Sequence, residues 1–259
     1  MAGTDKAKAA VLGGPAMILV DPQLGENIGM VARAMLNCGL GDLRLVRPRD
    51  GWPNPAAEAA AAGADSVLRR ARAFDATAQA IADLRRVYAT TARPRGMAKN
   101  LVSPRQAAAE MRAAIGRGET VGVLFGPERA GLTNDDLALA DAVLEVPLNP
   151  AFASLNLAQA VLLVGYEWYQ TGDSTPPRRL ATGAAGPAPK AELLNFFARL
   201  EAALDEANFF FPPEKRPAMV RNLRNLFQRA DLTESELRSL HGVVSALLSG
   251  RKGGAGQGG

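Results

Sequence analysis

Five polar residues stand in or shortly after three short loops: four lie in the loops, and Arg33 follows the first loop. They are Asn27, Arg33, Glu128, Ser154 and Asn156. The set holds two amides, a hydroxyl, a carboxylate and a guanidinium, and it lacks a typical pair of nucleophile and general base. Groups of this kind can position a ligand and stabilise developing charge. Positioning and charge stabilisation are therefore the chemistry that this set favours.

The histidine and cysteine content excludes several other site classes. The chain has one histidine, His241, and one cysteine, Cys38, so a zinc site built on a Cys/His cluster is excluded and no metal is expected. A Ser-His-Asp triad would need His241, which lies in an apolar helical stripe and is expected to be a structural residue. Cys38 is expected to be a small apolar filler near a helix end. No GxGxxG motif follows a predicted strand, and there is no Walker A lysine pattern.

Each polar stretch directly follows a short apolar run that predicts a buried strand. The pairs of strand and loop are 16–20 with 21–27, 121–125 with 126–132, and 143–146 with 147–156. The third loop opens a long helix whose apolar stripe is Leu157, Val161, Val164 and Trp168. Because ligands of open α/β sheets bind beyond the carboxyl ends of the strands, a site is expected where these loops meet. For the third loop alone, an ordinary strand-to-helix connection is an equally good interpretation.

The remaining elements continue the alternation of strands and helices. Further strands are predicted at 43–46 and 86–91, and further helices at 28–38, 56–64, 74–84 and 104–117, with a basic loop at 93–103. Alternation through residue 170 predicts an α/β domain with a mostly parallel sheet. The expected organisation is a disordered N-terminus at 1–15, this α/β domain at 16–170, a linker at 171–190, a small helical extension at 191–250 and a disordered tail at 251–259.

Composition indicates a globular protein with a mild basic bias. Of 259 residues, 47% are hydrophobic and 22% are charged, and the formal net charge is +4, which permits a nucleic-acid partner without requiring one. No apolar run reaches the length of about 18 residues that suggests a membrane span. The first 15 residues contain no apolar core of a signal peptide, so a cytoplasmic location without a membrane partner is expected.

Three motifs carry a resemblance to a known family. NIGMVARAM at 27–35, LFGPERAGL at 124–132 and VPLNPAFASLNLAQAV at 146–161 resemble the motifs of the SPOUT-class RNA 2′-O-methyltransferases of the SpoU/TrmH family. Their order and spacing over residues 16–170 make the resemblance specific. The segment 222–244 is similar to the C-terminal extension of the TrmJ branch, whose members methylate the ribose of the cytidine or uridine at position 32 in the anticodon loop of tRNA.

The resemblance implies a fold, a cofactor and roles for individual residues. It implies an α/β sheet with a deep trefoil knot, S-adenosylmethionine as cofactor, a tRNA substrate and a homodimer. The residues implied to bind the cofactor are Thr90, Thr91, Ala92, Leu124, Gly126, Val146, Leu148, Ala153, Ser154 and Leu155. The residues implied to surround the reaction centre are Asn27, Arg33, Glu128, Ser154 and Asn156. For RNA binding, the basic candidates are Arg93, Arg95, Lys99, Arg221 and Arg224.

Several alternatives remain open from the sequence. The substrate can instead be ribosomal RNA or another tRNA site, and a catalytically silent RNA-binding module is a third possibility. Arg33 is the family's proposed activator of the ribose hydroxyl, but guanidinium stays protonated, so holding a phosphate and stabilising alkoxide charge is the easier role to defend. If each residue is considered without its motif, the simpler interpretation is a solvated helix residue for Arg33, a surface ion pair with Arg129 for Glu128, and a helix cap for Asn156.

Overall fold

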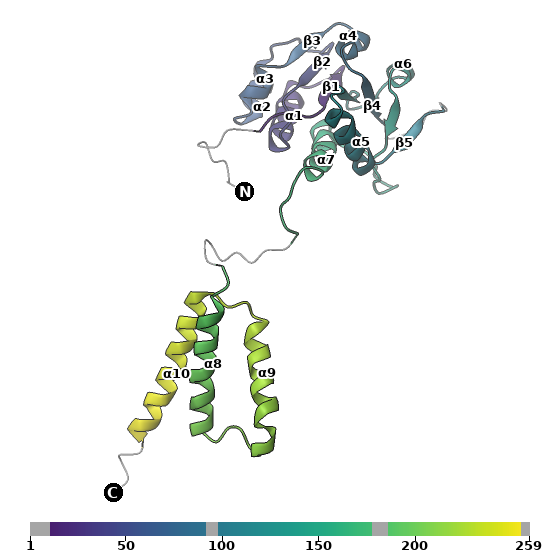
Figure 1. Ribbon diagram of the computed structural model, residues 1–259. Coiled ribbons are helices and arrows are strands. Elements are labelled where there is room, and N and C mark those ends of the chain that lie inside the picture. Colours follow the sequence, from purple (N-terminus) through teal and green to yellow (C-terminus); the bar gives the residue numbers. More distant parts are fainter. Residues whose placement is uncertain (1–10, 92–97, 178–185, 255–259) are drawn as a thin grey trace. The chain divides into compact units, whose positions relative to one another are not determined.

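The computed structural model describes residues 11–91, 98–177 and 186–254 (Figure 1). These residues form two compact units, divided between Thr175 and Pro176. The strands are β1 (Ala16–Val20), β2 (Leu43–Val46), β3 (Arg72–Phe74), β4 (Arg86–Thr90), β5 (Asn100–Val102), β6 (Val121–Phe125) and β7 (Ala142–Leu144). The helices of the first unit are α1 (Gly25–Asn37), α2 (Pro55–Ala61), α3 (Asp65–Leu68), α4 (Thr77–Ile81), α5 (Pro104–Gly116), α6 (Asn134–Ala138) and α7 (Leu157–Gln170).

The first unit is built on one seven-stranded sheet in the order β3-β2-β1-β6-β4-β7-β5. Every neighbouring pair is parallel, which confirms the predicted α/β class. β7 lies between β4 and β5 in the sheet, so the connection from β4 to β5 has to cross the position of β7 in the strand order. Part of that connection, residues 92–97, lies outside the described residues.

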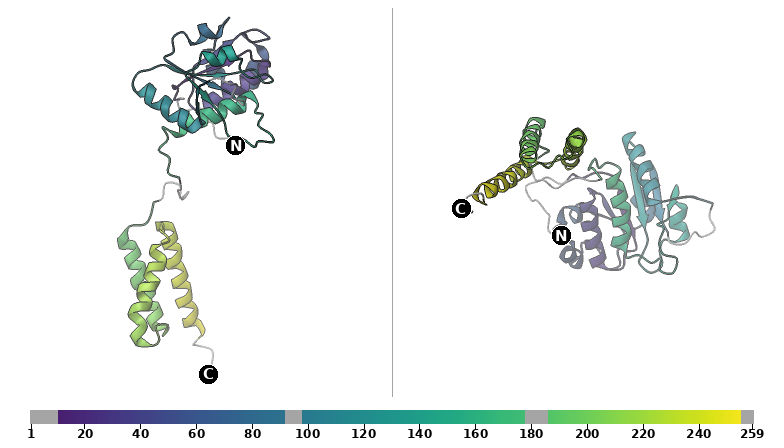
Figure 2. Two further views of the ribbon diagram at one scale, coloured as in Figure 1. Left: turned by 90° about the vertical axis from the view of Figure 1, so that its right-hand side faces the viewer. Right: turned by 90° about the horizontal axis from the view of Figure 1, so that it is seen from below.

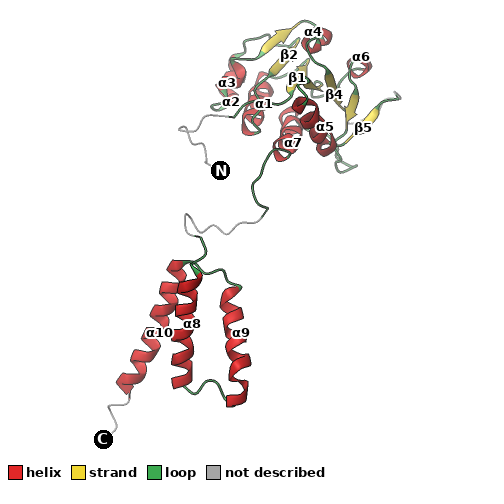
Figure 3. Cartoon of the chain, in the orientation of Figure 1, coloured by secondary structure: helices red, strands yellow, loops and turns green. Residues whose placement is uncertain are grey.

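Helices cover both faces of the sheet, as a parallel sheet requires (Figure 3). One face packs against α1, α2, α3, α5 and α7 through residues such as Met17, Leu19 and Phe125. The other face packs against α4 and α6 through the alternate residues, such as Ile18 and Leu124. Since both faces are buried, β1 and β6 are apolar along their whole length.

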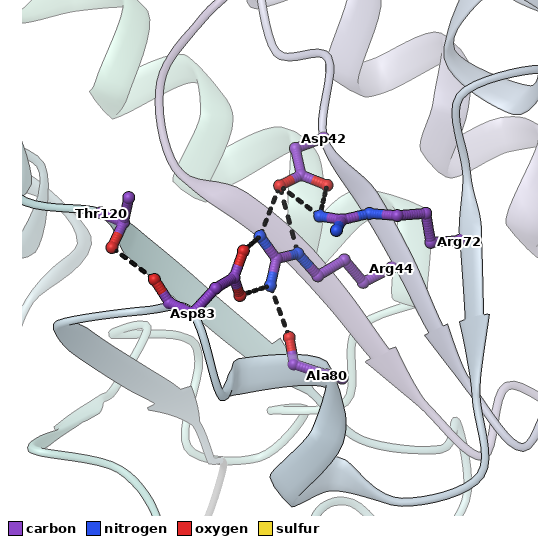
Figure 4. A network of polar contacts seen from close by, with 6 residues as sticks. All are labelled: Asp42, Arg44, Arg72, Ala80, Asp83 and Thr120. Atoms are coloured by element: carbon purple, nitrogen blue, oxygen red, sulfur yellow. Dashed lines mark hydrogen bonds and ion pairs between the residues drawn. The ribbon is translucent and has the colours of Figure 1, made fainter.

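A buried arginine connects several elements near the amino ends of the strands, opposite the carboxyl ends that the polar loops follow (Figure 4). Arg44 on β2 is 2% exposed, and its guanidinium donates to Asp42, to Asp83 and, at 2.6 Å, to the carbonyl oxygen of Ala80. The Arg44 guanidinium holds the pKa of Asp83 below its usual range. Thr120 Oγ1 donates to the carbonyl oxygen of Asp83 at 2.8 Å, so the network joins β2, α4 and the approaches to β4 and β6.

The second unit consists of α8 (Lys190–Glu206), a short 3-10 turn (Pro213–Lys215), α9 (Arg216–Gln228) and α10 (Glu234–Gly254), seen from two further sides in Figure 2. Phe196 and Phe197 are 1% exposed and form its core, with the Phe227 ring edge-on to Phe196 at a centroid distance of 5.1 Å. The His241 ring packs edge-on to Phe196 at 5.4 Å, which confirms the prediction of a structural histidine. The predicted capping box of Thr233 and Glu236 is also present.

Several predicted boundaries differ from the structure. The helix predicted at 74–84 is present only as the five-residue α4, and the edge strand β3 ends at its first predicted residue, Phe74. The basic loop predicted at 93–103 contains the edge strand β5. Three-residue strands are too short to show a period of two, which is why the sequence pattern missed both. At the chain ends, Gly13 N–H donates to the Gly39 carbonyl at 2.9 Å, and 251–254 continue α10, although disorder was expected there.

Other local predictions are confirmed. The stripe Leu157, Val161, Val164 and Trp168 is buried on α7. Cys38 is 4% exposed, and burial raises the pKa of its thiol, as expected for an unreactive filler. α1 begins three residues earlier than predicted, at Gly25, and its first turn lies close to Asn54. A Cβ atom on Gly25 would lie 2.5 Å from Asn54 Oδ1.

Candidate functional site

The three polar loops follow β1, β6 and β7, which are neighbours in the sheet except that β4 lies between β6 and β7. The loop after β1 leads into α1, the loop 126–132 follows β6, and the loop 145–156 follows β7 and leads into α7. Because the strands are parallel and adjacent, their carboxyl ends meet at this edge. The three stretches singled out in the sequence therefore lie beside one another in the folded chain.

Asn27, Glu128 and Asn156 form a continuous chain of hydrogen bonds across these loops. Asn27 Nδ2 donates to Glu128 Oε1 at 2.6 Å, and Asn156 Nδ2 donates to Asn27 Oδ1 at 3.0 Å. The second carboxylate oxygen of Glu128 accepts from the backbone N–H of Gln23 at 3.1 Å. Asn27 is 4% exposed, so this arrangement satisfies a buried amide and fixes the direction of the carboxylate.

Asn156 is at the same time the N-cap of α7. Its Oδ1 accepts from the backbone N–H of Ala158 at 2.8 Å, and Gln159 Oε1 accepts from the backbone N–H of Asn156 at 3.1 Å. The side-chain oxygen holds the helix while the side-chain nitrogen holds Asn27. Capping and a role in the site are therefore compatible, and Glu128 is engaged by Asn27 rather than paired with Arg129.

A cavity of about 1130 Å³ opens beside this hydrogen-bonded chain. Eight of the residues expected to bind the cofactor line it: Thr90, Thr91, Gly126, Val146, Leu148, Ala153, Ser154 and Leu155. Leu124 does not line it, because its side chain is buried in the core beneath, and its carbonyl oxygen accepts from Thr90 Oγ1 at 3.0 Å. Ala92 lies outside the described residues.

Gly126 is required by the loop itself. A Cβ atom on this residue would lie 2.2 Å from the backbone nitrogen of Leu132 and 2.4 Å from the carbonyl carbon of Gly131. The loop 126–132 therefore turns back so tightly that any side chain on Gly126 would force its backbone apart. This loop presents Glu128 to Asn27 and forms one wall of the cavity.

The structure does not bring all five polar residues together. Ser154 lines the cavity but is exposed, and no hydrogen-bond partner for its side chain lies within the described parts of the chain. Arg33 is exposed on α1, and within the described ranges its guanidinium has no hydrogen bond or ion pair. Six positions along a helix rotate a side chain by about 240°, which explains why Asn27 is buried while Arg33 faces outward.

The predicted RNA-binding residues also fall into different settings. Arg93 and Arg95 lie outside the described residues. Lys99 Nζ donates to the backbone carbonyls of Ala138, at 2.9 Å, and of Ala140, so this ammonium closes the end of α6. Arg224 makes two hydrogen bonds to Glu201, at 2.6 and 2.9 Å. Arg221 is exposed, and the part of the chain that the structure describes offers it no partner.

Two charged residues of the cavity wall were missed by the sequence analysis. Glu145 follows β7 and Arg129 follows Glu128, and both line the cavity. Arg129 lies in one of the three motifs, where the sequence suggests only a surface pair with Glu128. The available signal for Glu145 is a lone carboxylate inside the apolar run 143–146.

Two features are absent from the described residues. Within 11–91, 98–177 and 186–254, no group of three or more His, Cys, Asp or Glu side chains could hold a metal ion. Over the same ranges, none of the helices combines the length and the apolar character needed to cross a bilayer.

Comparison with known proteins matches both units. Residues 15–166 match the SpoU rRNA Methylase family, and residues 191–256 match the C-terminal domain of tRNA methyltransferase TrmJ. The chain is 35% identical over 243 residues to the tRNA (cytidine/uridine-2′-O-)-methyltransferase TrmJ of Klebsiella pneumoniae, an alignment that covers 92% of this chain and 97% of that protein. It is 33% identical over 239 residues to the tRNA (cytidine/uridine/adenosine-2′-O-)-methyltransferase TrmJ of Pseudomonas aeruginosa, covering 88% and 91% of the two chains.

Solved structures agree with these matches. The crystal structure of TrmJ from Z. mobilis ZM4 aligns with a TM-score of 0.75 and 52% sequence identity, over 91% of this chain and 99% of that one. The SpoU methyltransferase AviRb from Streptomyces viridochromogenes, solved in complex with AdoMet, is 17% identical, with a TM-score of 0.50 over 66% of each chain, and shares the fold. With the family match over more than half of its length and relatives aligned almost end to end, the chain belongs to the SpoU methylase family, in its TrmJ branch.

Proposed function

We propose that this protein is an S-adenosylmethionine-dependent 2′-O-methyltransferase that modifies the ribose of the cytidine or uridine at position 32 in the anticodon loop of tRNA. The observation that carries the proposal is the hydrogen-bonded chain of Asn27, Glu128 and Asn156 beside a large cavity at the carboxyl ends of the sheet. Family membership, and relatives named as tRNA methyltransferases over nearly the whole chain, support the reaction and the substrate.

The cavity suits a ligand with the mixed chemistry of S-adenosylmethionine. Leu144, Val146 and Leu155 supply apolar walls for an adenine ring and a methylene chain, and charged side chains stand at other points of the lining. Backbone groups of the glycine- and proline-rich loops add hydrogen-bonding capacity. The trefoil knot of the family would place the loop 145–156 against the connection between β4 and β5, and the position of β7 between those two strands supports it.

When bound, the cofactor supplies a methyl group on a sulfonium centre. The chain's own task is to hold the ribose hydroxyl in line with that methyl group and to stabilise the negative charge that develops on its oxygen. Glu128 is held by Asn27 and by the backbone of Gln23, so the site is preorganised on one side. Arg33 has its guanidinium uncommitted within the described ranges, and it is assigned to the substrate phosphate and the developing alkoxide.

A homodimer is part of the proposal. The outer face of α7 exposes Leu162, Leu163, Tyr166 and Tyr169, whose spacing places them on one side of the helix. An apolar and aromatic stripe of this kind is typical of an interface. Arg33, which is exposed and does not line the cavity of its own chain, would complete a reaction centre near such an interface. The molar mass in solution, measured by light scattering, tests this part.

The second unit is assigned to tRNA binding. It matches the TrmJ C-terminal domain, and Arg221 on α9 offers an uncommitted guanidinium within the described ranges. Arg224 is less suited to the predicted RNA contact, because its guanidinium already donates two hydrogen bonds to Glu201. Binding through phosphates should weaken steeply as salt rises, since bound counterions are released.

Methyl transfer from tritium-labelled S-adenosylmethionine tests the function directly. The expected result is label in purified tRNA, lost when position 32 carries a 2′-deoxy nucleotide. Ribosomal RNA is the matched alternative substrate, favoured by the family name that the first unit matches. Label in ribosomal RNA but not in tRNA would establish that alternative, and binding without label in either RNA would establish a silent RNA-binding module.

A further inference from the structure

Three charged side chains belong to the cavity wall within the described residues: Glu128, Arg129 and Glu145. They differ in what they already contact. Glu128 is engaged by Asn27 and by the backbone of Gln23. The carboxylate of Glu145 has no hydrogen bond or ion pair anywhere in the described parts of the chain. The wall therefore contains one committed carboxylate and one that is available to a ligand.

The backbone holds Glu145 in a defined position. Its N–H donates to the carbonyl of Val102 at 3.0 Å, which continues the pairing of β7 with β5 by one residue. Its neighbours Leu144 and Val146 both pack with the hydrophobic cluster under α5 and α7. Because side chains alternate along extended chain, Glu145 belongs to the opposite side, where Leu132 and the loop 126–132 form the wall.

The side chain is half-buried, so its charge is partly withdrawn from water. A carboxylate in such a position without a partner is unfavourable, and a ligand cation placed beside it would restore the lost interaction. The proposed cofactor carries two positive centres, the sulfonium and the α-ammonium, both in its methionine portion. Arg129, exposed on the same wall, carries a positive charge that would complement the carboxylate of that cofactor.

We propose that Glu145 is a cofactor-positioning residue that binds the positively charged methionine portion of S-adenosylmethionine. The inference rests on the proposed cofactor and adds to it a specific side-chain contact. The two positive centres make different predictions. A contact with the sulfonium favours S-adenosylmethionine over the product S-adenosylhomocysteine, which has lost that charge. A contact with the α-ammonium favours both equally over 5′-methylthioadenosine, which has neither the ammonium nor the sulfonium.

Isothermal titration calorimetry of the full chain with these three ligands tests the proposal. Glu145→Gln keeps the size of the side chain and one acceptor oxygen, replaces the other oxygen by an NH2 donor and removes the charge. We expect it to weaken S-adenosylmethionine binding by about ten-fold or more, as for the loss of a charge-assisted hydrogen bond, and to leave 5′-methylthioadenosine unchanged. Glu58→Gln, which removes an exposed carboxylate of α2 outside the cavity, should change neither affinity.

The affinity for S-adenosylhomocysteine then identifies the contact, because it falls only if Glu145 binds the ammonium. Equal S-adenosylmethionine affinity in wild type and Glu145→Gln would overturn the inference and leave the proposed function standing. Equal weakening of all three ligands would also overturn it, since 5′-methylthioadenosine lacks both cations. If the wild-type protein itself does not bind S-adenosylmethionine, the proposed function fails first, and this inference fails with it.

Discussion

Replacing Asn27 by aspartate should make the stability of the first unit depend on pH. The change is nearly isosteric, but it puts a carboxylate oxygen in the place of Asn27 Nδ2, 2.6 Å from Glu128 Oε1. Asn27 is 4% exposed, so water cannot separate the two charges. At neutral pH the pair is expected to take up one proton, which restores a hydrogen bond between the two oxygens.

The loss of folding stability in Asn27→Asp depends on the pH at which the pair must keep that proton. A carboxyl group titrates near pH 4 in the unfolded chain, so holding one proton at pH 7 requires a pKa raised by about three units, worth about 4 kcal/mol of stability. At pH 5 the pKa must be raised by only about one unit, so the loss of folding stability is about 1 kcal/mol. The folded variant binds a proton that the unfolded chain releases. Its stability relative to wild type therefore falls as pH rises from 4 to 7.

Urea denaturation of wild type and Asn27→Asp at pH 5 and pH 7 measures this difference. Tryptophan fluorescence reports on the first unit, because both tryptophans, Trp52 and Trp168, lie in it. Asn37→Asp is the matched control. It adds a charge at the exposed far end of the same helix and should cost less than about 1 kcal/mol at either pH. An Asn27→Asp penalty that is the same at both pH values would refute the reasoning.

Three further outcomes are expected. Arg33→Lys and Arg33→Ala should each lose about 2–4 kcal/mol of transition-state stabilisation in single-turnover methylation of tRNA, while their cofactor affinity stays near that of wild type. Normal turnover of Arg33→Ala would show that Arg33 is a surface residue without a role in the reaction. Gly126→Val should abolish the thermal stabilisation by S-adenosylhomocysteine, because its Cβ would meet the backbone of Leu132, so an unchanged thermal shift would contradict the loop geometry. A chain ending at Thr175 should fold and bind cofactor but bind tRNA weakly in filter assays, and full tRNA affinity would assign the second unit another role.

Local pattern was enough for much of the fold. The buried strand at 121–125 and the capping box of Thr233 and Glu236 depend on residues within a few positions of one another. So does the apolar stripe of α7. Such features are visible in a sequence because the interacting groups are neighbours along the chain. The family motifs also placed the three loops, although the catalytic role of each residue in them stays a prediction.

Tertiary structure alone decided which charged and polar side chains are available to a ligand. Arg224 and Lys99 look alike as solvated basic residues in the sequence, yet Glu201 holds one and the carbonyls at the end of α6 hold the other. Glu145 drew no attention in the sequence, yet it is the carboxylate of the cavity wall that has no partner within the described ranges. For the same reason the sequence pattern missed β3 and β5, because each pairs with a strand distant in the sequence. A hydrogen bond or ion pair is settled by distance in space, and the partners here lie tens of residues apart.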